Sequence, residues 1–374
     1  MTSFSRHGWV GTRPRAIWAL GLLLGPVACQ DARVDRPNPS ADPPVSPERP
    51  ADPNAAEPRD AGGWDLAVPQ GVDAGRPPDA RSACPGGVSP PPRPCAEIGV
   101  TVDPAYADRY TCFDLGPVPG VPPTKYGGLT LTQEKCSTTL LIGGEANLAA
   151  GKIYAVPVLR DQTGHISGFG GTAQVFADAP YNDGGLVFTS QGVLLATRWP
   201  SNEIQMTRPG AATVDKVIDL APLGVAFASA SLNFVPATLP AAGALKLVSW
   251  SQGSWYTVTL QPDGQGLFDI PTVMFSLNLP GGPEGFVYVA KGSPLFDVDS
   301  LLVSEWTANR ISTYTIDDEA DPVLGSRRDF VVGLDGAEGA YRDPATGDFF
   351  FSTWGQMADR VIVVRGFAPI PVID

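Results

Sequence analysis

The sequence predicts an all-β fold, a β-propeller of five four-stranded blades, from three observations. A short pattern recurs five times: an apolar strand, an aromatic or acidic residue, a few polar or small residues, and a second strand. The copies repeat every 48–56 residues, which is typical of propeller blades. The apolar runs are short and rich in Val, Ile, Thr and aromatic residues, and Gly, Pro, Asn or Asp separates them.

Each copy of the pattern supplies the second and third strands of one blade. The anchor positions of the five copies are Glu145, Trp199, Trp250, Trp306 and Trp354. Five steps of this length account for nearly all residues from 96 onward. Six blades are the alternative, but no interval between anchors is long enough to hold a further blade.

The last copy lacks a fourth strand before the sequence ends. The segment Tyr110–Leu115 resembles the fourth strand of the second unit, which begins at Lys216. We therefore expect Tyr110–Leu115 to complete the last blade. This pairing would join the two ends of the ring and remove its open edges.

Residues 1–28 have the layout of a bacterial lipoprotein signal peptide. Three arginines precede an apolar run, residues 16–27, that is too short to span a bilayer. Ala28 then precedes Cys29, which we expect to carry the lipid; ordinary secretory cleavage nearby is the alternative. Gln30 follows the cysteine, where inner-membrane retention signals usually have Asp, and this favours the outer membrane.

Residues 29–95 are expected to form a disordered Pro-rich linker, and residues 96–374 the propeller. The linker lacks apolar periodicity, so it cannot bury enough surface to offset its ordering entropy. The net charge of the whole chain is −13, and removal of a leader with three arginines and no acid makes it three units more negative. This charge argues against nucleic acid as a partner. We expect a monomer.

Four cysteines remain beside Cys29, namely Cys84, Cys95, Cys112 and Cys136. An even set in an exported protein indicates disulfides, and four cysteines allow three pairings. Proximity in the sequence favours Cys84–Cys95 and Cys112–Cys136.

The alternation of strand direction places two sets of loops on one face, here called the top face. These are the loops that enter each inner strand and the loops between the second and third strands. The residues that open the inner strands are Tyr126, Asp183, Ser229, Glu284 and Glu338. Oxygen ligands of this kind suit Ca²⁺, so Asp183, Glu284 and Glu338 form a candidate metal site. The alternative is that the acids bind backbone N–H groups or face water.

Four tryptophans at equivalent positions would form an aromatic rim on the same face. Such rims suit sugar rings and other flat ligands, whereas the alternative role is packing between blades. The candidate ligand-binding residues are Tyr126, Trp199, Asn202, Trp250, Trp306, Asn309 and Trp354. For the two asparagines, a left-handed turn conformation is the alternative.

The strand starts PEGF at Pro283 and GAEGAY at Gly336 resemble the Glu-Gly strand starts of the NHL and SMP-30/gluconolactonase-like propellers. The resemblance implies a divalent cation on the top face, held by Glu, Asn and Asp, with Glu284, Glu338 and Asp183 as the corresponding residues here. The chain departs from the family in lacking its Glu-Gly-Pro-x-Trp stretch and in having five predicted blades instead of six.

These observations favour a lipid-anchored binding or scaffolding module over an enzyme. The module would be displayed at the cell envelope and would bind a glycan, a peptide or a protein through its top face. A metal-dependent hydrolase of the lactonase type and a purely structural envelope protein are the two alternatives.

Overall fold

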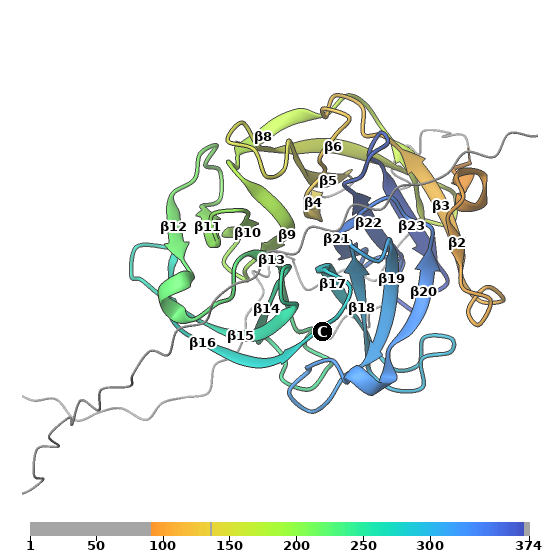
Figure 1. The fold of residues 1–374 in the computed structure, drawn as a ribbon. Helices are drawn as coiled ribbons and strands as arrows, with labels where there is room; N and C mark the ends of the chain where they lie inside the picture. Colours follow the sequence, from red (N-terminus) through yellow and green to blue (C-terminus); the bar gives the residue numbers. More distant parts are fainter. Residues whose placement is uncertain (1–90, 135–136, 370–374) are drawn as a thin grey trace, which may run out of the picture. The chain divides into compact units, whose positions relative to one another are not determined.

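The computed structural model describes residues 91–134 and 137–369, in which strands β1–β23 and three short 3-10 helices are found. The strands form five antiparallel sheets that follow one another around a central axis in chain order (Figure 1). The protein is therefore an all-β propeller of five blades, as predicted. The predicted signal peptide, Cys29 and residues 29–90 of the linker lie outside the described residues. No helix within the described ranges is long and apolar enough to cross a membrane.

The first three blades each read outward from the axis. Blade 1 contains β4 (Leu129–Glu134), β5 (Ser137–Gly144), β6 (Lys152–Arg160), β7 (Ile166–Phe169) and β8 (Gln174–Asp178), the last two pairing with β6. Blade 2 contains β9 (Asn182–Phe188), β10 (Leu194–Arg198), β11 (Glu203–Thr207) and β12 (Lys216–Asp219). Blade 3 contains β13 (Ser229–Phe234), β14 (Leu245–Ser249), β15 (Ser254–Pro262) and β16 (Phe268–Asn278).

The last two blades each gain a fifth strand from the start of the described chain. Blade 4 contains β17 (Pro283–Val289), β18 (Ser300–Glu305), β19 (Arg310–Thr315), β20 (Arg328–Val332) and β2 (Thr101–Val102). Blade 5 contains β21 (Ala337–Arg342), β22 (Phe349–Thr353), β23 (Val361–Arg365), β3 (Thr111–Gly116) and β1 (Arg93–Pro94). The 3-10 helices are η1 (Cys95–Ile98), η2 (Ala221–Leu223) and η3 (Leu324–Ser326).

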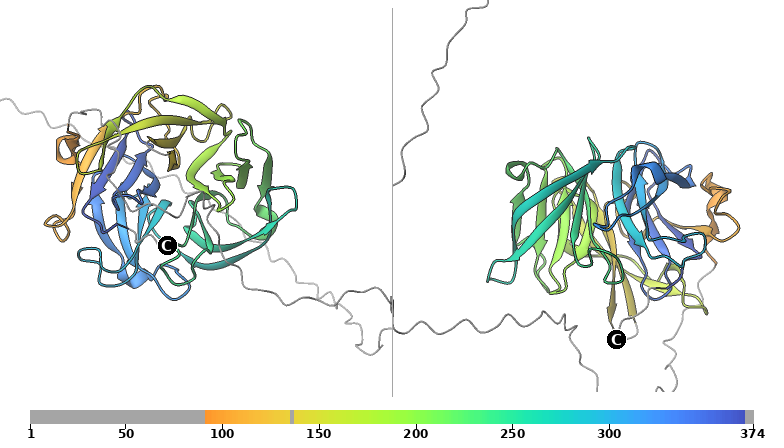
Figure 2. Two further views of the ribbon diagram at one scale, coloured as in Figure 1. Left: turned by 180° about the vertical axis from the view of Figure 1, so that it is seen from behind. Right: turned by 90° about the horizontal axis from the view of Figure 1, so that it is seen from below.

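The ring is closed by β3, which pairs with β23 across blade 5. Val363 lies opposite Phe113 in this antiparallel pair, and Figure 2 shows β3 alongside the last strands of the chain. The buried carboxylate of Asp114 adds ion pairs to Arg360, at 2.9 Å, and Arg93, at 2.7 Å. The closing strand predicted at residues 110–115 is thus confirmed.

The apolar core is divided among the junctions between neighbouring blades. Five separate clusters of buried apolar side chains are found, and each joins two adjacent blades. The junction of blades 4 and 5 includes Phe330, Phe349 and Phe351, all fully buried. The blades are therefore fixed to each other mainly by the hydrophobic effect, with β3 closing the ring by backbone hydrogen bonds.

The disulfide differs from the pairings predicted from sequence proximity. Cys95 is bonded to Cys112, with their Cα atoms 5.4 Å apart, so neither Cys84–Cys95 nor Cys112–Cys136 is formed here. The reason is the β1–β3 pairing, in which Pro94 lies opposite Phe113 and brings the first residue of η1 beside β3. Cys84 and Cys136 lie outside the described residues.

Candidate functional site

The acidic residues of three inner strands lie in β-bulges. The strands β9, β17 and β21 lose register with their neighbours at Asp183, Glu284 and Glu338. At Glu338, the freed backbone N–H of Gly339 is satisfied by the hydroxyl of Ser352 at 2.9 Å. A bulge bends its strand and redirects a side chain, and here it lets each acid point along the blade toward the axis.

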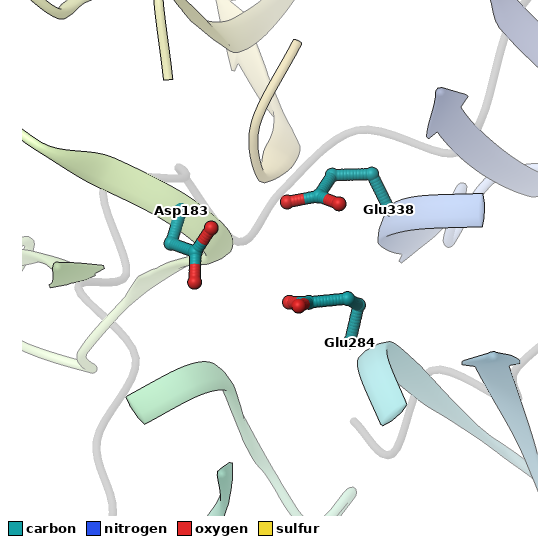
Figure 3. A group of neighbouring side chains, drawn as sticks. All are labelled: Asp183, Glu284 and Glu338. Carbon is teal, nitrogen blue, oxygen red and sulfur yellow. The ribbon is translucent and has the colours of Figure 1, made fainter. Parts of the chain in front are cut away.

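The bulges bring the three carboxylates together at the top end of the central channel. One carboxylate oxygen from each of Asp183, Glu284 and Glu338 lies within 4.8 Å of the other two. The three groups come from blades 2, 4 and 5 and point toward one another (Figure 3). Their exposed fractions are 2, 4 and 1%. Among the five strand-start positions, these three therefore form one buried acidic cluster, here called the acid floor.

Two oxygens of the acid floor have no hydrogen-bond partner. Asp183 shares a hydrogen bond with Glu338, but Oδ2 of Asp183 and Oε2 of Glu284 are buried and bonded to nothing. With its amide nitrogen turned toward the acid, Asn147 donates to Oδ1 of Asp183 at 2.9 Å. Buried polar atoms without partners are costly, so the floor is incomplete without a further group.

The electrostatics of the acid floor favour a bound positive charge. Burial raises the pKa of Asp183 despite its hydrogen bonds with Glu338 and Asn147. Burial also raises the pKa of Glu284 well above the ordinary glutamate value, and the charges of Asp183 and Glu338 raise it further. The pKa of Glu338 is raised by burial first and then by Asp183 and Asp359. A cation placed among these groups would favour their charged forms.

Tryptophans wall a pocket above the acid floor. The pocket has a volume of about 150 Å³, and its lining residues are Asn147, Asp183, Trp199, Trp250, Glu284, Trp306, Glu338 and Trp354. The four tryptophans come from the loops between the second and third strands of blades 2–5. The structure therefore places both predicted sets of loops around one opening on the top face.

The tryptophans also contact one another across the blades. The ring of Trp306 lies 6.0 Å from Trp250 and 5.3 Å from Trp354, measured between centroids. Trp306 Nε1 donates a hydrogen bond to the carbonyl oxygen of Trp354 at 2.8 Å. Packing between blades and lining of a ligand pocket are thus roles of the same side chains, and the packing holds the wall in place.

An ammonium and a second aromatic ring lie beside this wall. The Nζ atom of Lys125 is 5.5 Å from the ring centroid of Trp354, within the range of cation–π attraction. Phe227 is 6.5 Å from Trp199 and is 54% exposed. The tryptophan wall is therefore accessible to cations and continues into an exposed apolar group.

Three predicted ligand-binding residues do not line the pocket. Tyr126 is fully buried, and its hydroxyl accepts a hydrogen bond from the backbone N–H of Val118. Asn202 and Asn309 have φ of 54° and 53°, and both use their side chains to bond nearby backbone groups. Ser229, a strand-start position, is also buried and bonds backbone carbonyls.

Sequence reasoning missed Asn147 as a site residue. It occupies the same loop position as the two turn asparagines and has φ of 65°, which gave it the appearance of a turn residue only. The available signal was that blade 1 has Glu145 in place of a tryptophan, which leaves space over the channel for the neighbouring amide.

Comparisons with known proteins give structural likeness at low identity. No protein-family profile and no curated sequence matches the chain. Among solved structures, an auxiliary nutrient binding protein from Bacteroides thetaiotaomicron is 12% identical, with 72% of this chain and 68% of that chain covered and a TM-score of 0.40. An aldose sugar dehydrogenase from Streptomyces coelicolor is 15% identical, with 67% and 83% covered and a TM-score of 0.36. A virginiamycin B lyase from Staphylococcus aureus is 11% identical, with 68% and 99% covered and a TM-score of 0.34. At these values the likenesses do not bear on what this protein binds.

Proposed function

We propose that the protein is a binding module whose top-face pocket takes up a small ligand with a positively charged group. The observation that carries the proposal is the pair of buried, unpartnered oxygens, Oδ2 of Asp183 and Oε2 of Glu284, beneath a wall of four tryptophans. The charged group would lie on the acid floor, where it supplies the missing hydrogen-bond donors or ligand bonds.

The tryptophan wall supports uptake of an organic ligand. Indole rings give a large apolar contact area with an N–H at one edge, and they attract cations over their faces. Concave pockets with apolar walls and a few convergent polar groups are typical ligand sites. The pocket, at about 150 Å³, is smaller than sites for drug-sized molecules, which run from about 300 Å³ upward, so the bound part of the ligand is small.

A divalent cation is the second candidate for the acid floor. Oxygens that ligate one Ca²⁺ ion at about 2.3–2.6 Å are at most about 5 Å apart, and the three carboxylate oxygens meet this condition. The amide of Asn147 is a further oxygen ligand at the same place. Under this alternative the protein would be a metal-dependent hydrolase of the lactonase type, in which the ion activates a water molecule.

We also propose that the module acts at the cell envelope. The support is in the sequence, where Cys29 follows a lipoprotein-like leader and a Pro-rich linker precedes the propeller. A glycan or protein partner that carries a cationic group would then meet the top-face pocket outside the cytoplasm.

The test is a thermal melt of the mature protein after treatment with EDTA, with organic and inorganic cations added separately. Suitable probes are n-butylammonium, tetramethylammonium, Ca²⁺ and Mg²⁺. A ligand that binds the native state raises Tm by mass action, so at least one cation should raise Tm in the wild type and not in Glu284→Gln.

The matched control is Glu319→Gln, which makes the same chemical change at an exposed loop residue of blade 4. It should keep the full response. If none of the four cations raises Tm at millimolar concentration, the proposed function is wrong.

A further inference from the structure

We infer that the charged group that the pocket accepts is a primary ammonium at the end of an alkyl chain. The inference rests on the proposed function and names its ligand class. It is carried by the number and spacing of the acceptors on the acid floor and by the composition of the wall above them.

The floor presents three acceptors at the spacing that an ammonium requires. A primary ammonium has three N–H donors and no acceptor. With tetrahedral N–H directions and charge-assisted N···O distances of about 2.8 Å, its three acceptors lie ~4.6 Å apart. One oxygen from each of Asp183, Glu284 and Glu338 lies within 4.8 Å of the other two. The three donors and the three carboxylates therefore match one to one.

The unpartnered atoms favour a donor group over a quaternary ammonium. Oδ2 of Asp183 and Oε2 of Glu284 are buried without partners. A primary ammonium would donate one hydrogen bond to each, and its third N–H would reach Glu338. A quaternary ammonium has no N–H, so it would leave these acceptors desolvated and unsatisfied.

The wall favours an alkyl chain over a metal ion. Ca²⁺ takes six to eight oxygen ligands, whereas the groups above the floor are four indoles and one amide, that of Asn147. Indole surfaces instead suit methylene groups and the positive end of the chain. The 5.5 Å approach of the Lys125 ammonium to Trp354 is an example of this contact in the same wall.

The glycine beside Asp183 supports the same occupant. A Cβ atom on Gly184 would lie 2.8 Å from Oε2 of Glu284, so only glycine leaves that oxygen free to point at the channel. The unpartnered oxygen is thus kept accessible by the residue next to another member of the floor.

The experiment measures Kd by isothermal titration calorimetry on the metal-stripped mature protein. The probes are n-propyl-, n-butyl- and n-pentylammonium, tetramethylammonium and Ca²⁺. We expect n-butylammonium to bind at least tenfold more tightly than tetramethylammonium. We also expect the affinity to rise with chain length, by roughly fourfold for each methylene group buried against the wall.

The variants separate the floor from the wall. Glu284→Gln should weaken n-butylammonium by at least tenfold and reduce its preference over tetramethylammonium, while Glu319→Gln should leave both unchanged. Trp250→Phe should reduce the gain per methylene group with less effect on that preference. A melt of each variant without ligand checks that it is folded.

Two results would overturn the inference while the proposed function stands. One is tetramethylammonium binding as tightly as n-butylammonium, which would mean that N–H donors do not matter. The other is Ca²⁺ binding that n-butylammonium does not displace. Nα-acetyl-lysine methylamide distinguishes the sources of the group: binding as tight as that of n-butylammonium would indicate a lysine side chain of a partner, and much weaker binding a free amine.

Discussion

Trp306 donates its indole N–H to the backbone carbonyl oxygen of Trp354, 2.8 Å away. The two residues belong to neighbouring blades, and their rings are also in contact. The pocket wall is therefore held by the ring of blades itself before any ligand arrives. A wall ordered in advance lowers the conformational cost of binding.

Replacement of Trp306 by Phe should keep an aromatic ring in the wall but remove this hydrogen bond. We expect a loss of about 1 kcal/mol in the free energy of unfolding, which is typical for one hydrogen bond, and weaker ligand binding. Urea unfolding measures the first effect. Trp250→Phe is the matched control, because it removes an indole from the same wall without touching this bond. Equal stability of Trp306→Phe and the wild type would contradict the role assigned to the bond.

Glu284→Gln should stabilise the protein at neutral and alkaline pH. Burial and two neighbouring acids raise the pKa of Glu284 in the folded state, whereas the unfolded chain has the ordinary value of about 4.3. Above that pH the unfolded state binds fewer protons than the folded state, so stability falls as pH rises toward the raised pKa. Gln has no proton to lose and avoids this fall.

The difference in Tm between Glu284→Gln and the wild type should therefore grow in favour of the variant from pH 5 to pH 8. Scanning calorimetry at several pH values measures it, with Glu319→Gln as a control that should show no trend. A variant that is less stable than the wild type at pH 8 would show that Glu284 is not buried as a strained charge.

Ring closure predicts that the last strand is indispensable. A chain that ends after Trp354 lacks β23, which pairs with both β22 and β3, so blade 5 would be split and two sheet edges exposed. We expect no cooperative thermal transition for this truncation. A chain that ends at Pro369 keeps β23 and should melt like the full-length protein. Cooperative melting of the shorter chain at an unchanged Tm would refute the closure.

The disulfide between Cys95 and Cys112 should stabilise the domain. It closes a loop with a sequence separation of 17, for which the chain-entropy estimate is about 3 kcal/mol. Cys95→Ala/Cys112→Ala should therefore lower the urea midpoint under oxidising conditions. The same comparison in a reducing agent is the control, since both proteins then lack the bond. An unchanged midpoint under oxidising conditions would mean that the pairing of β1 with β3 suffices.

The blade count and the closing strand could be predicted because both are written in repeated local patterns. Each blade repeats one strand-loop-strand signature, and parity of strand direction then places Asp183, Glu284 and Glu338 on one face. Glycine directly after each acid is the local mark of a bulge. These are features of short segments, so a single sequence is enough to read them.

The failures depend on how distant segments meet. Tyr126 aligns with Asp183 in the repeat, but the pairing of β4 with β5 shows no register shift, so nothing redirects Tyr126 toward the axis and its ring stays in the core. The partner of Cys95 was misjudged because β3 leaves its neighbours in the sequence to join blade 5. Proximity in the chain cannot anticipate either effect.

The glycines that follow the acids have a consequence for the size of the ligand. A Cβ on Gly285 would lie 2.3 Å from the backbone nitrogen of Ala340, and one on Gly339 would lie 2.7 Å from the Cα of Gly128. These glycines let the inner strands approach closely enough for five blades to complete a circle. The circumference of that circle sets the separation of the acids, so it also selects the diameter of the charged group. A duplicated sixth blade would keep every residue of the floor and still abolish the site.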